Sequence, residues 1–125
     1  TWPACALAGD IDPVATETAR TNLAANGFAG RVGAVTAAGF RHPRLARGRY
    51  DLIFANILAG PLKALAPELA VHQAPGGVAI LSGLLARQAA GVLSVYAGWG
   101  YRRIDRIPVG EWLTLVLRRG ALPRA

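Results

Sequence analysis

Short apolar runs and segments of helical periodicity alternate along most of the chain. The apolar runs have the length of strands and are bounded by turn residues, and they lie at residues 4–9, 31–35, 51–55 and 78–81. Apolar residues at helical spacing predict helices that begin near residues 13, 61 and 87 and end near residues 26, 73 and 97. Strands that alternate with helices predict a parallel sheet with crossover helices.

The first predicted helix has signals at both ends. Asp12 is a favourable N-cap, Pro13 suits the first helical position, and Asn26-Gly27 closes the helix. Its buried stripe is expected at Val14, Thr18, Ala19 and Leu23. The glycine- and arginine-rich segment 39–49 is predicted to be a loop, and residues 74–77 are predicted to be a turn.

The last two predicted strands, residues 101–107 and 112–117, have no helix between them. Strands joined by such a short connection pair antiparallel as a hairpin. The predicted fold class is therefore α/β, with a Rossmann-like sheet that is mostly parallel and ends in an antiparallel hairpin. This combination resembles the end of the sheet in class I S-adenosylmethionine-dependent methyltransferases.

The composition agrees with one folded domain and excludes several classes of protein. The 125 residues are 53% hydrophobic and 17% charged, which is typical of a packed globular chain. No apolar run reaches the roughly 18 residues that span a bilayer, so no membrane association is expected. The single cysteine, Cys5, excludes an internal disulfide and suits a cytoplasmic protein.

The net charge of +7 comes almost entirely from arginine, which provides all but one of the fourteen basic residues. Arginine-rich surfaces favour phosphate or acidic partners. Several arginines gather at residues 41–49, which leaves open a non-catalytic module that binds RNA through this loop. The chain lacks the aromatic residues on which single-stranded RNA stacks, so no specific nucleic acid is expected.

Two polar residues stand where predicted strands end. Open α/β sheets bind ligands outside the carboxyl ends of their strands. Asp10 follows the first strand, where it could accept hydrogen bonds from ribose hydroxyls or be an ordinary loop carboxylate. Asn56 follows the run 50–55. Its amide oxygen could hold a substrate amine in line with an electrophilic methyl group, or its side chain could cap the next helix.

The remaining candidates are weaker. Ser82 follows a strand and could line the pocket. His42 and His72 have no acidic or cysteine companion at ligand spacing, so no metal site is predicted. Trp99 and Trp112 read as packing residues at the hairpin.

Several short motifs lie in the order and at the spacing of one known family. They are AGDIDP at residues 8–13, NLAANG at 22–27, YDLIFANILAGP at 50–61, APGG at 74–77, LSGLL at 81–85 and EW at 111–112. With these motifs the chain resembles the PrmA family, whose members methylate the eleventh protein of the large ribosomal subunit. The resemblance covers nearly the whole chain, from about residue 6 to residue 119.

The resemblance implies S-adenosylmethionine as cofactor and a ribosomal large-subunit protein as partner and substrate. It places Asp10 on the cofactor ribose and Asn56, as the catalytic residue, between the cofactor and the target amine. Leu58 would take the place of the wall that related amino-methyltransferases build from a Pro-Pro-aromatic run. The amino groups methylated in this family are lysine side chains and an N-terminal amine. Another class I amine or protein methyltransferase is the alternative enzyme.

The family also has features without a counterpart in this sequence, namely a glycine-rich cofactor loop and a separate N-terminal domain. Residues 1–125 are therefore predicted to be an N-terminally truncated catalytic domain. In this class the first strand lies between the strands that end at Asp10 and Asn56, so its absence would leave open sheet edges that favour association. The chain alone is expected to bind cofactor poorly and to transfer no methyl group.

Overall fold

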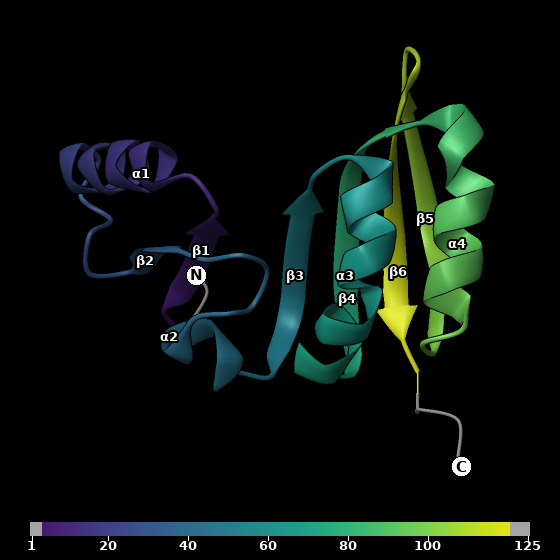
Figure 1. Ribbon diagram of the computed structural model, residues 1–125, viewed down its shortest axis with the longest axis horizontal. Helices are drawn as coiled ribbons and strands as arrows, with labels where there is room; N and C mark the ends of the chain where they lie inside the picture. The colour runs from purple at the N-terminus through teal and green to yellow at the C-terminus, as the bar shows by residue number, and fades with distance from the viewer. Residues whose placement is uncertain (1–3, 121–125) are drawn as a thin grey trace. The chain divides into compact units, whose positions relative to one another are not determined.

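Two parallel strands joined by a helix form the first part of the structure. This computed structural model describes residues 4–120, and its first compact unit, the N-terminal unit, is Thr1–Gly48. Strand β1 (Ala6–Asp10) pairs in parallel with β2 (Val32–Thr36). The crossover between them contains α1 (Pro13–Ala25), as the alternation of strand and helix predicts (Figure 1).

Both ends of α1 follow the predicted signals. The Asp12 carboxylate accepts a hydrogen bond from the Val14 amide at 2.9 Å, which satisfies one of the free N–H groups at the helix start. Pro13 occupies the first turn. After the C-cap Asn26, the chain turns at Gly27 with a φ of +77°, a conformation that favours glycine.

The buried face of α1 differs from the predicted stripe. Val14 is 72% exposed and Thr18 is also exposed, whereas the buried residue is Thr16. The Thr16 hydroxyl donates to the Asp12 carbonyl at 3.1 Å and accepts from the Thr36 hydroxyl at 3.0 Å. The prediction was wrong for Val14 and Thr18, whereas Ala19 and Leu23 are half-buried. It missed Thr16 because these hydrogen bonds satisfy a polar side chain inside the unit.

The predicted loop 39–49 contains a short helix, α2 (Pro43–Ala46). His42 caps it, with Nδ1 accepting a hydrogen bond from the Arg44 amide at 3.1 Å. Leu45 is buried in a small core with Val35 and Ala37, and this anchor explains why the segment is ordered rather than an open loop.

The second compact unit, the C-terminal unit, is Arg49–Ala125. Its elements are β3 (Tyr50–Asn56), α3 (Ala59–His72), β4 (Gln73–Leu85), η1 (Ala86–Gln88), α4 (Ala89–Ala97), β5 (Tyr101–Val109) and β6 (Trp112–Arg119). The four strands form one sheet in the order β3-β4-β6-β5 (Figure 1). The pair β3–β4 is parallel, whereas β6 pairs antiparallel with both β4 and β5. The sheet is thus mixed: it is partly parallel, and it has the predicted antiparallel hairpin at its C-terminal end.

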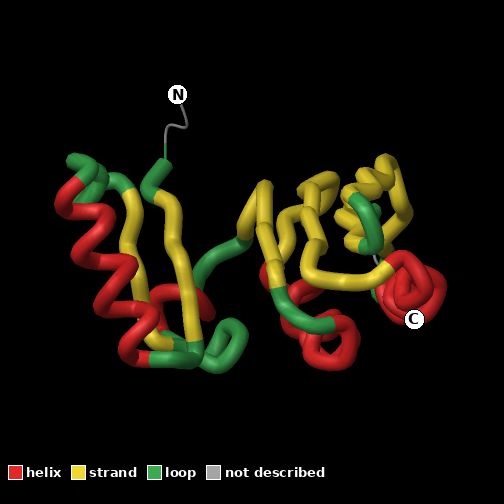
Figure 2. The backbone as a smooth tube through the Cα atoms, turned by 90° about the horizontal axis from the view of Figure 1, so that it is seen from above, coloured by secondary structure: helices red, strands yellow, loops and turns green. Residues whose placement is uncertain are grey.

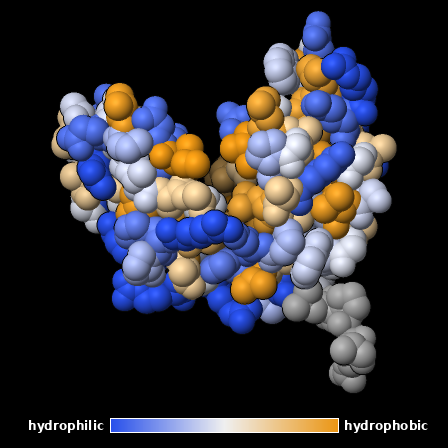
Figure 3. All heavy atoms as spheres, in the orientation of Figure 1, coloured by the Kyte–Doolittle hydropathy of each residue, from blue (hydrophilic) through white to orange (hydrophobic). Residues whose placement is uncertain are grey.

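Alternate residues of this sheet form the core of the C-terminal unit. Those on one face are almost fully buried, and they are Ala55, Ala79, Leu81, Leu84, Leu113, Leu115 and Leu117. Helices α3 and α4 lie on the same side of the strands (Figure 2). The residues of the other face are more exposed, and Phe54 and Val109 are 71% and 70% exposed. Hydrophobic side chains accordingly appear among hydrophilic ones on the molecular surface (Figure 3).

A buried glutamine joins three strands at the end of the sheet opposite Asn56. Gln73 is fully buried, and its Nε2 donates to the carbonyls of Tyr50 and Val78 at 3.0 and 3.2 Å. Its Oε1 accepts a hydrogen bond from the Tyr101 hydroxyl at 3.0 Å. Burial raises the pKa of Tyr101, so this hydroxyl stays protonated and remains a donor.

Strand β4 was predicted at residues 78–81, but it is longer at both ends and runs from Gln73 to Leu85. Tyr50 lies opposite Gln73, but Leu52 lies opposite Val78, so residues 74–77 interrupt the register. The predicted turn is therefore present as an irregularity within β4, where Gly76 has a φ of +77°.

The strands form two separate sheets, β1-β2 and β3-β4-β6-β5. Within residues 4–120, β1 pairs only with β2 and β3 pairs only with β4, so each has one unpaired edge. Association through these edges remains a prediction. No helix in the described part of the chain is long and apolar enough to cross a membrane.

Candidate active site

The pairing of β3 with β4 brings two predicted site residues together. The strands are parallel, and Asn56 at the end of β3 lies opposite Ser82. Ser82 was predicted to follow a strand, but it lies within β4, which continues to Leu85. The carboxyl end of β3 is at the edge of an α/β sheet at which ligands bind. The separate predictions for Asn56 and Ser82 therefore converge on one place in the C-terminal unit.

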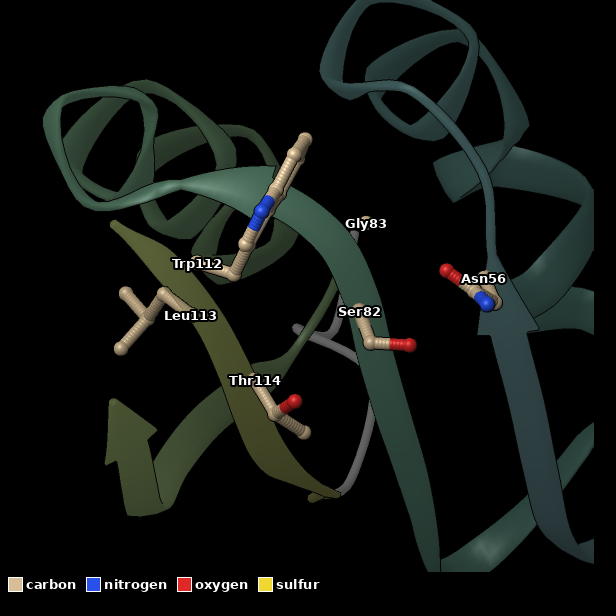
Figure 4. A pocket seen from close by; sticks show the side chains of 6 residues that line it. All are labelled: Asn56, Ser82, Gly83, Trp112, Leu113 and Thr114. Carbon is tan, nitrogen blue, oxygen red and sulfur yellow. The ribbon is translucent and has the colours of Figure 1, made fainter. Parts of the chain in front are cut away.

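A pocket of about 380 Å³ opens beside these two residues. It is lined by Asn56, Ser82, Gly83, Trp112, Leu113 and Thr114, which come from β3, β4 and β6. The Ser82 hydroxyl points toward Asn56, while the Leu113 side chain points away from both (Figure 4). The Leu113 side chain packs in the core on the helix-covered face, so it supports the pocket wall but does not face a ligand in the pocket.

The backbone at Gly83 approaches Asn56 closely. A Cβ atom added to Gly83 would lie 2.8 Å from Asn56 Oδ1 and 2.9 Å from the Ile57 carbonyl oxygen. Gly83 also has a φ of +85°, a backbone conformation that residues other than glycine rarely adopt. The register of β4 with β6 shifts between Leu81 and Leu84, which is where this glycine lies. Glycine is therefore needed here both for the conformation of β4 and for the space next to the asparagine.

The alternative of Asn56 as a helix cap does not match the structure. The N-cap of α3 is Leu58, and no side chain provides a capping hydrogen bond there. Asn56 is exposed at the end of β3, and its side chain makes no hydrogen bond within residues 4–120. Its amide oxygen is thus available to a ligand.

The lining of the pocket carries no charged side chain. Its polar side-chain groups are the amide of Asn56, the hydroxyls of Ser82 and Thr114, and the indole N–H of Trp112, which can only donate. Their oxygens can accept hydrogen bonds from an amine, but the lining contains no carboxylate to form an ion pair and no histidine to act as a base. Chemistry at this site would rely on positioning a reactant rather than on acid or base catalysis by the lining residues.

Leu58 does not line this pocket. It lies two residues beyond Asn56 at the start of α3 and is 70% exposed. Its assignment as a substrate contact therefore remains a prediction.

Trp112, Gly83 and Thr114 are pocket residues that the sequence prediction missed. The interpretation of Trp112 as a packing residue was wrong, because it is 54% exposed and lines the pocket. The sequence placed Trp112 at the start of the last predicted strand, but it did not show that this strand pairs beside the one that carries Ser82. A tryptophan at a strand end does not by itself distinguish a core residue from a pocket wall.

Asp10 lies at the carboxyl end of β1 in the N-terminal unit, as Asn56 lies at the carboxyl end of β3 in the C-terminal unit. Its carboxylate is exposed, and Oδ1 accepts a hydrogen bond from the Asp12 amide at 2.9 Å. This local bond orients the carboxylate and leaves Oδ2 able to accept further hydrogen bonds. A small pocket of about 120 Å³ lies between β1, β2 and α1 and includes Asp10 in its lining.

The described residues contain no group of histidine, cysteine, aspartate and glutamate side chains that could hold a metal ion. In the segment 41–49, Arg47 donates from Nε to the Pro43 carbonyl at 3.0 Å, and the Arg44 side chain lies against Gly33. These arginines are partly engaged within their own unit. RNA binding by this loop remains a prediction.

Solved structures place the fold among class I methyltransferases. One is the ribosomal protein L11 methylase from Lactobacillus delbrueckii subsp. bulgaricus, which superposes with a TM-score of 0.85 and 28% sequence identity over 94% of this chain and 59% of that chain. Another is an RNA methyltransferase from Salinibacter ruber, solved in complex with S-adenosyl-L-homocysteine, with a TM-score of 0.74 over 100% of this chain and 72% of that chain. At 16% identity, the second shows a shared fold only.

The sequence identifies the family within that class. Residues 3–120 match the family model described as ribosomal protein L11 methyltransferase (PrmA), and the chain belongs to this family. The ribosomal protein L11 methyltransferase of Chelativorans sp. is 47% identical over 114 residues, which are 90% of this chain and 39% of that protein. The ribosomal protein L11 methyltransferase of Agrobacterium fabrum is 46% identical over 118 residues, which are 94% of this chain and 40% of that protein. The chain thus spans about two-fifths of the length of the curated relatives it matches.

Proposed function

We propose that this chain serves in the S-adenosylmethionine-dependent methylation of amino groups on ribosomal protein L11, at lysine side chains and an N-terminal amine. The observation that carries the proposal is the pairing of Asn56, at the end of β3, with Ser82 of β4, beside a pocket lined by uncharged groups. Membership of the ribosomal protein L11 methyltransferase family supports the choice of substrate.

In this proposal, the Asn56 amide oxygen accepts a hydrogen bond from the target amine and so fixes the direction of its nitrogen lone pair. The hydroxyls of Ser82 and Thr114 offer further acceptors for the remaining N–H groups. When bound, S-adenosylmethionine supplies an electrophilic methyl group. An unprotonated amine is the nucleophile, and a lining without carboxylates does not favour its protonated form. Leu58, at the start of α3, is proposed as an apolar contact of the substrate.

The residues present also fit the ribose of the cofactor. Asp10 is an exposed carboxylate at the end of a parallel strand, and a backbone amide already orients one of its oxygens. A carboxylate at this place can accept hydrogen bonds from ribose hydroxyls. Asp10 is therefore proposed to bind the ribose, and Asn56 to lie between the cofactor and the target amine.

The proposal is tested by calorimetric titration of S-adenosylmethionine into two proteins. One is the 125-residue chain, and the other is the Chelativorans relative with its matched region replaced by this chain. We expect the chimera to bind cofactor and to methylate ribosomal protein L11, as detected by mass spectrometry. We expect the 125-residue chain to bind poorly and to transfer no methyl group. A chimera that folds but neither binds cofactor nor transfers a methyl group would overturn the proposal.

Replacing the aspartate at the end of β1 tests the ribose contact. Asp10→Asn in the chimera keeps an oxygen for the Asp12 amide but removes the charge that strengthens hydrogen bonds from hydroxyls. Since a hydrogen bond to a charged group contributes about 1.5–3 kcal/mol, we expect cofactor affinity to fall about 10- to 100-fold. The matched control is Asp12→Asn, which keeps the cap of α1 and should change affinity less than about threefold. Equal losses in both variants would refute a specific role for Asp10.

Replacing the asparagine at the end of β3 tests the amine contact. Asn56→Ala in the chimera removes the acceptor that positions the nitrogen, and we expect the maximal rate of methyl transfer to fall about 10- to 100-fold. The matched control is Asn22→Ala, at an exposed position of α1, which should leave the rate unchanged. Single-turnover measurements at saturating cofactor separate this loss from weaker cofactor binding. An unchanged rate would exclude Asn56 from catalysis.

A further inference from the structure

The turn that presents Asp10 has no hydrophobic anchor of its own. It runs from Asp10 at the end of β1 through Ile11 to Asp12, the N-cap of α1. Ile11 is 73% exposed, and Val14 in the first turn of α1 is 72% exposed. The small pocket that Asp10 helps to line is formed mostly by alanine and glycine. Packing therefore contributes little to the direction of the Asp10 carboxylate, and hydrogen bonds must fix it.

Hydrogen bonds hold both ends of this turn to β2. At its start, the Asp10 carbonyl accepts a hydrogen bond from the Ala37 amide at 2.8 Å, one residue beyond the end of β2. At its end, the Asp12 carbonyl accepts from the amide and from the hydroxyl of Thr16, at 3.0 and 3.1 Å. The Thr16 hydroxyl itself accepts from the Thr36 hydroxyl of β2 at 3.0 Å. Thr16 thus joins the end of the turn to the neighbouring strand.

Thr16 differs from the other threonine of α1 that bonds to its own helix. The Thr21 hydroxyl donates to the Glu17 carbonyl at 3.1 Å, which is the usual local bond of a helical threonine. Thr21 is exposed, and within residues 4–120 its side chain makes no hydrogen bond to a strand. Thr16 is 2% exposed and is the buried residue of α1. Water therefore does not compete for its hydroxyl, and the bond to β2 persists.

The link reaches the Asp10 carboxylate through the backbone of Asp12. Thr16 holds the Asp12 carbonyl, and the Asp12 amide donates to Asp10 Oδ1 at 2.9 Å. An amide that is held in place fixes the rotation of the carboxylate and leaves Oδ2 to accept hydrogen bonds from a ligand. A carboxylate that is already oriented loses less conformational freedom when a ligand binds it, so the affinity is higher.

We infer that Thr16 is a positioning residue, whose buried hydroxyl ties the turn 10–12 to β2 and thereby orients the Asp10 carboxylate for the hydroxyls of a ribose. The inference rests on the proposed function, in which Asp10 binds the ribose, and it adds the residue that acts on the cofactor through Asp10. It predicts that loss of the Thr16 hydroxyl weakens the recognition of ribose hydroxyls and not the binding of the cofactor in general.

The hold on the turn can be measured on the 125-residue chain without cofactor. Thr16→Val keeps the size and branching of the side chain but removes its hydroxyl. We expect the Asp12 amide to exchange its proton about three- to tenfold faster in this variant, as measured by NMR, because the turn opens more often. Thr16→Ser, which keeps the hydroxyl, should restore the slow exchange. Unchanged exchange at Asp12 would overturn the inference, and so would equal acceleration at every amide of α1, because the hydroxyl would then stabilise the helix as a whole.

The consequence for binding is measured by calorimetry in the chimera with two ligands. One is S-adenosylhomocysteine, and the other is its analogue with a dideoxyribose, which lacks both ring hydroxyls. We expect Thr16→Val to weaken the binding of S-adenosylhomocysteine about three- to tenfold and the binding of the analogue less than about twofold. When Asp10 is already replaced by asparagine, Thr16→Val should cost less than about twofold for either ligand. The matched control, Thr21→Val, should change neither affinity.

The outcomes separate this inference from the proposed function. Equal weakening of both ligands by Thr16→Val would indicate a merely structural role and overturn the inference. An undiminished loss in the Asp10→Asn background would overturn it as well, because Thr16 would then act independently of Asp10. If the unsubstituted chimera binds neither ligand, the proposed function fails, and the exchange measurement on the 125-residue chain still decides whether Thr16 holds the turn.

Discussion

Gly83→Ala is expected to lower the free energy of unfolding by about 3–4 kcal/mol, a loss at the upper end of single substitutions. Two costs add at this position. The φ of +85° strains an alanine by about 1–2 kcal/mol. The new Cβ would also meet Asn56 Oδ1 at 2.8 Å and the Ile57 carbonyl oxygen at 2.9 Å, so the end of β3 must move away from β4. Urea denaturation, followed by circular dichroism, measures the loss.

Gly76→Ala is the matched control for this substitution. Gly76 lies in the same strand with a φ of +77°, but nothing lies within 4 Å of its added Cβ atom. Its loss should therefore be the strain alone, about 1–2 kcal/mol. Equal losses in the two variants would show that the close approach of Gly83 to Asn56 has no energetic weight. In the chimera, only Gly83→Ala should also impair methyl transfer, because it displaces the asparagine.

Gln73→Glu is expected to destabilise the protein by about 3–5 kcal/mol at pH 8, as an unpaired charge in the core does. The side chain of Gln73 is fully buried and faces the carbonyls of Tyr50 and Val78. A carboxylate can donate to neither carbonyl, and its charge would lie against two acceptors. The hydrogen bond from Tyr101 could persist, and the positive charge of the buried Arg119, which acts on Tyr101, would offset only part of the penalty.

The same substitution should make stability depend on pH in a defined direction. The fold would raise the pKa of the introduced carboxyl above its unfolded value of about 4.3. Below that value the carboxyl is protonated in both states and the charge penalty is absent. The penalty grows as the pH rises from about 4 through the folded pKa and is complete above it. Urea midpoints of variant and unsubstituted chain should therefore diverge from pH 4 to pH 8.

Gln88→Glu is the control for this charge effect. Gln88 uses its side-chain oxygen to accept a hydrogen bond from the Leu85 amide at 2.8 Å, at the start of a helical segment. A carboxylate accepts that bond equally well and is favoured at a helix start. We expect a change of less than about 0.5 kcal/mol, and little dependence on pH in this range. If Gln88→Glu lowered the free energy of unfolding as much as Gln73→Glu, the explanation would be wrong, because only Gln73 uses its side chain as a donor.

The order of strands and helices was predictable because hydrophobic burial dominates it. Leucines at alternate positions of β6 face the core, and a continuous apolar run marks β3, so both strands were recognised from pattern alone. The patterns failed where polar groups decide the structure. The burial of Thr16 depends on a hydroxyl of β2, and the start of β4 depends on the hydrogen bonds of Gln73.

Two of the six residues that line the pocket followed from the same reasoning. Asn56 and Ser82 each end an apolar run, and parallel pairing brings such ends together. The contribution of Trp112 could not be predicted, because it depends on which strand lies next to β4 and on which face its side chain takes. The close approach of Gly83 depends on a φ angle and on a register shift that composition does not encode. Asp10 is placed by its own strand, and its role remains a prediction.

The uncharged lining of the pocket has a consequence for ionic strength. The protein carries a net charge of +7, which repels a free cation at a distance, and salt screens such fields beyond a Debye length of about 8 Å at physiological concentration. Attraction inside the pocket would instead come from the amide and hydroxyl dipoles of Asn56, Ser82 and Thr114 at contact, which salt hardly screens. Added salt weakens an ion pair, but here it would ease the approach of an ammonium group and leave its binding intact.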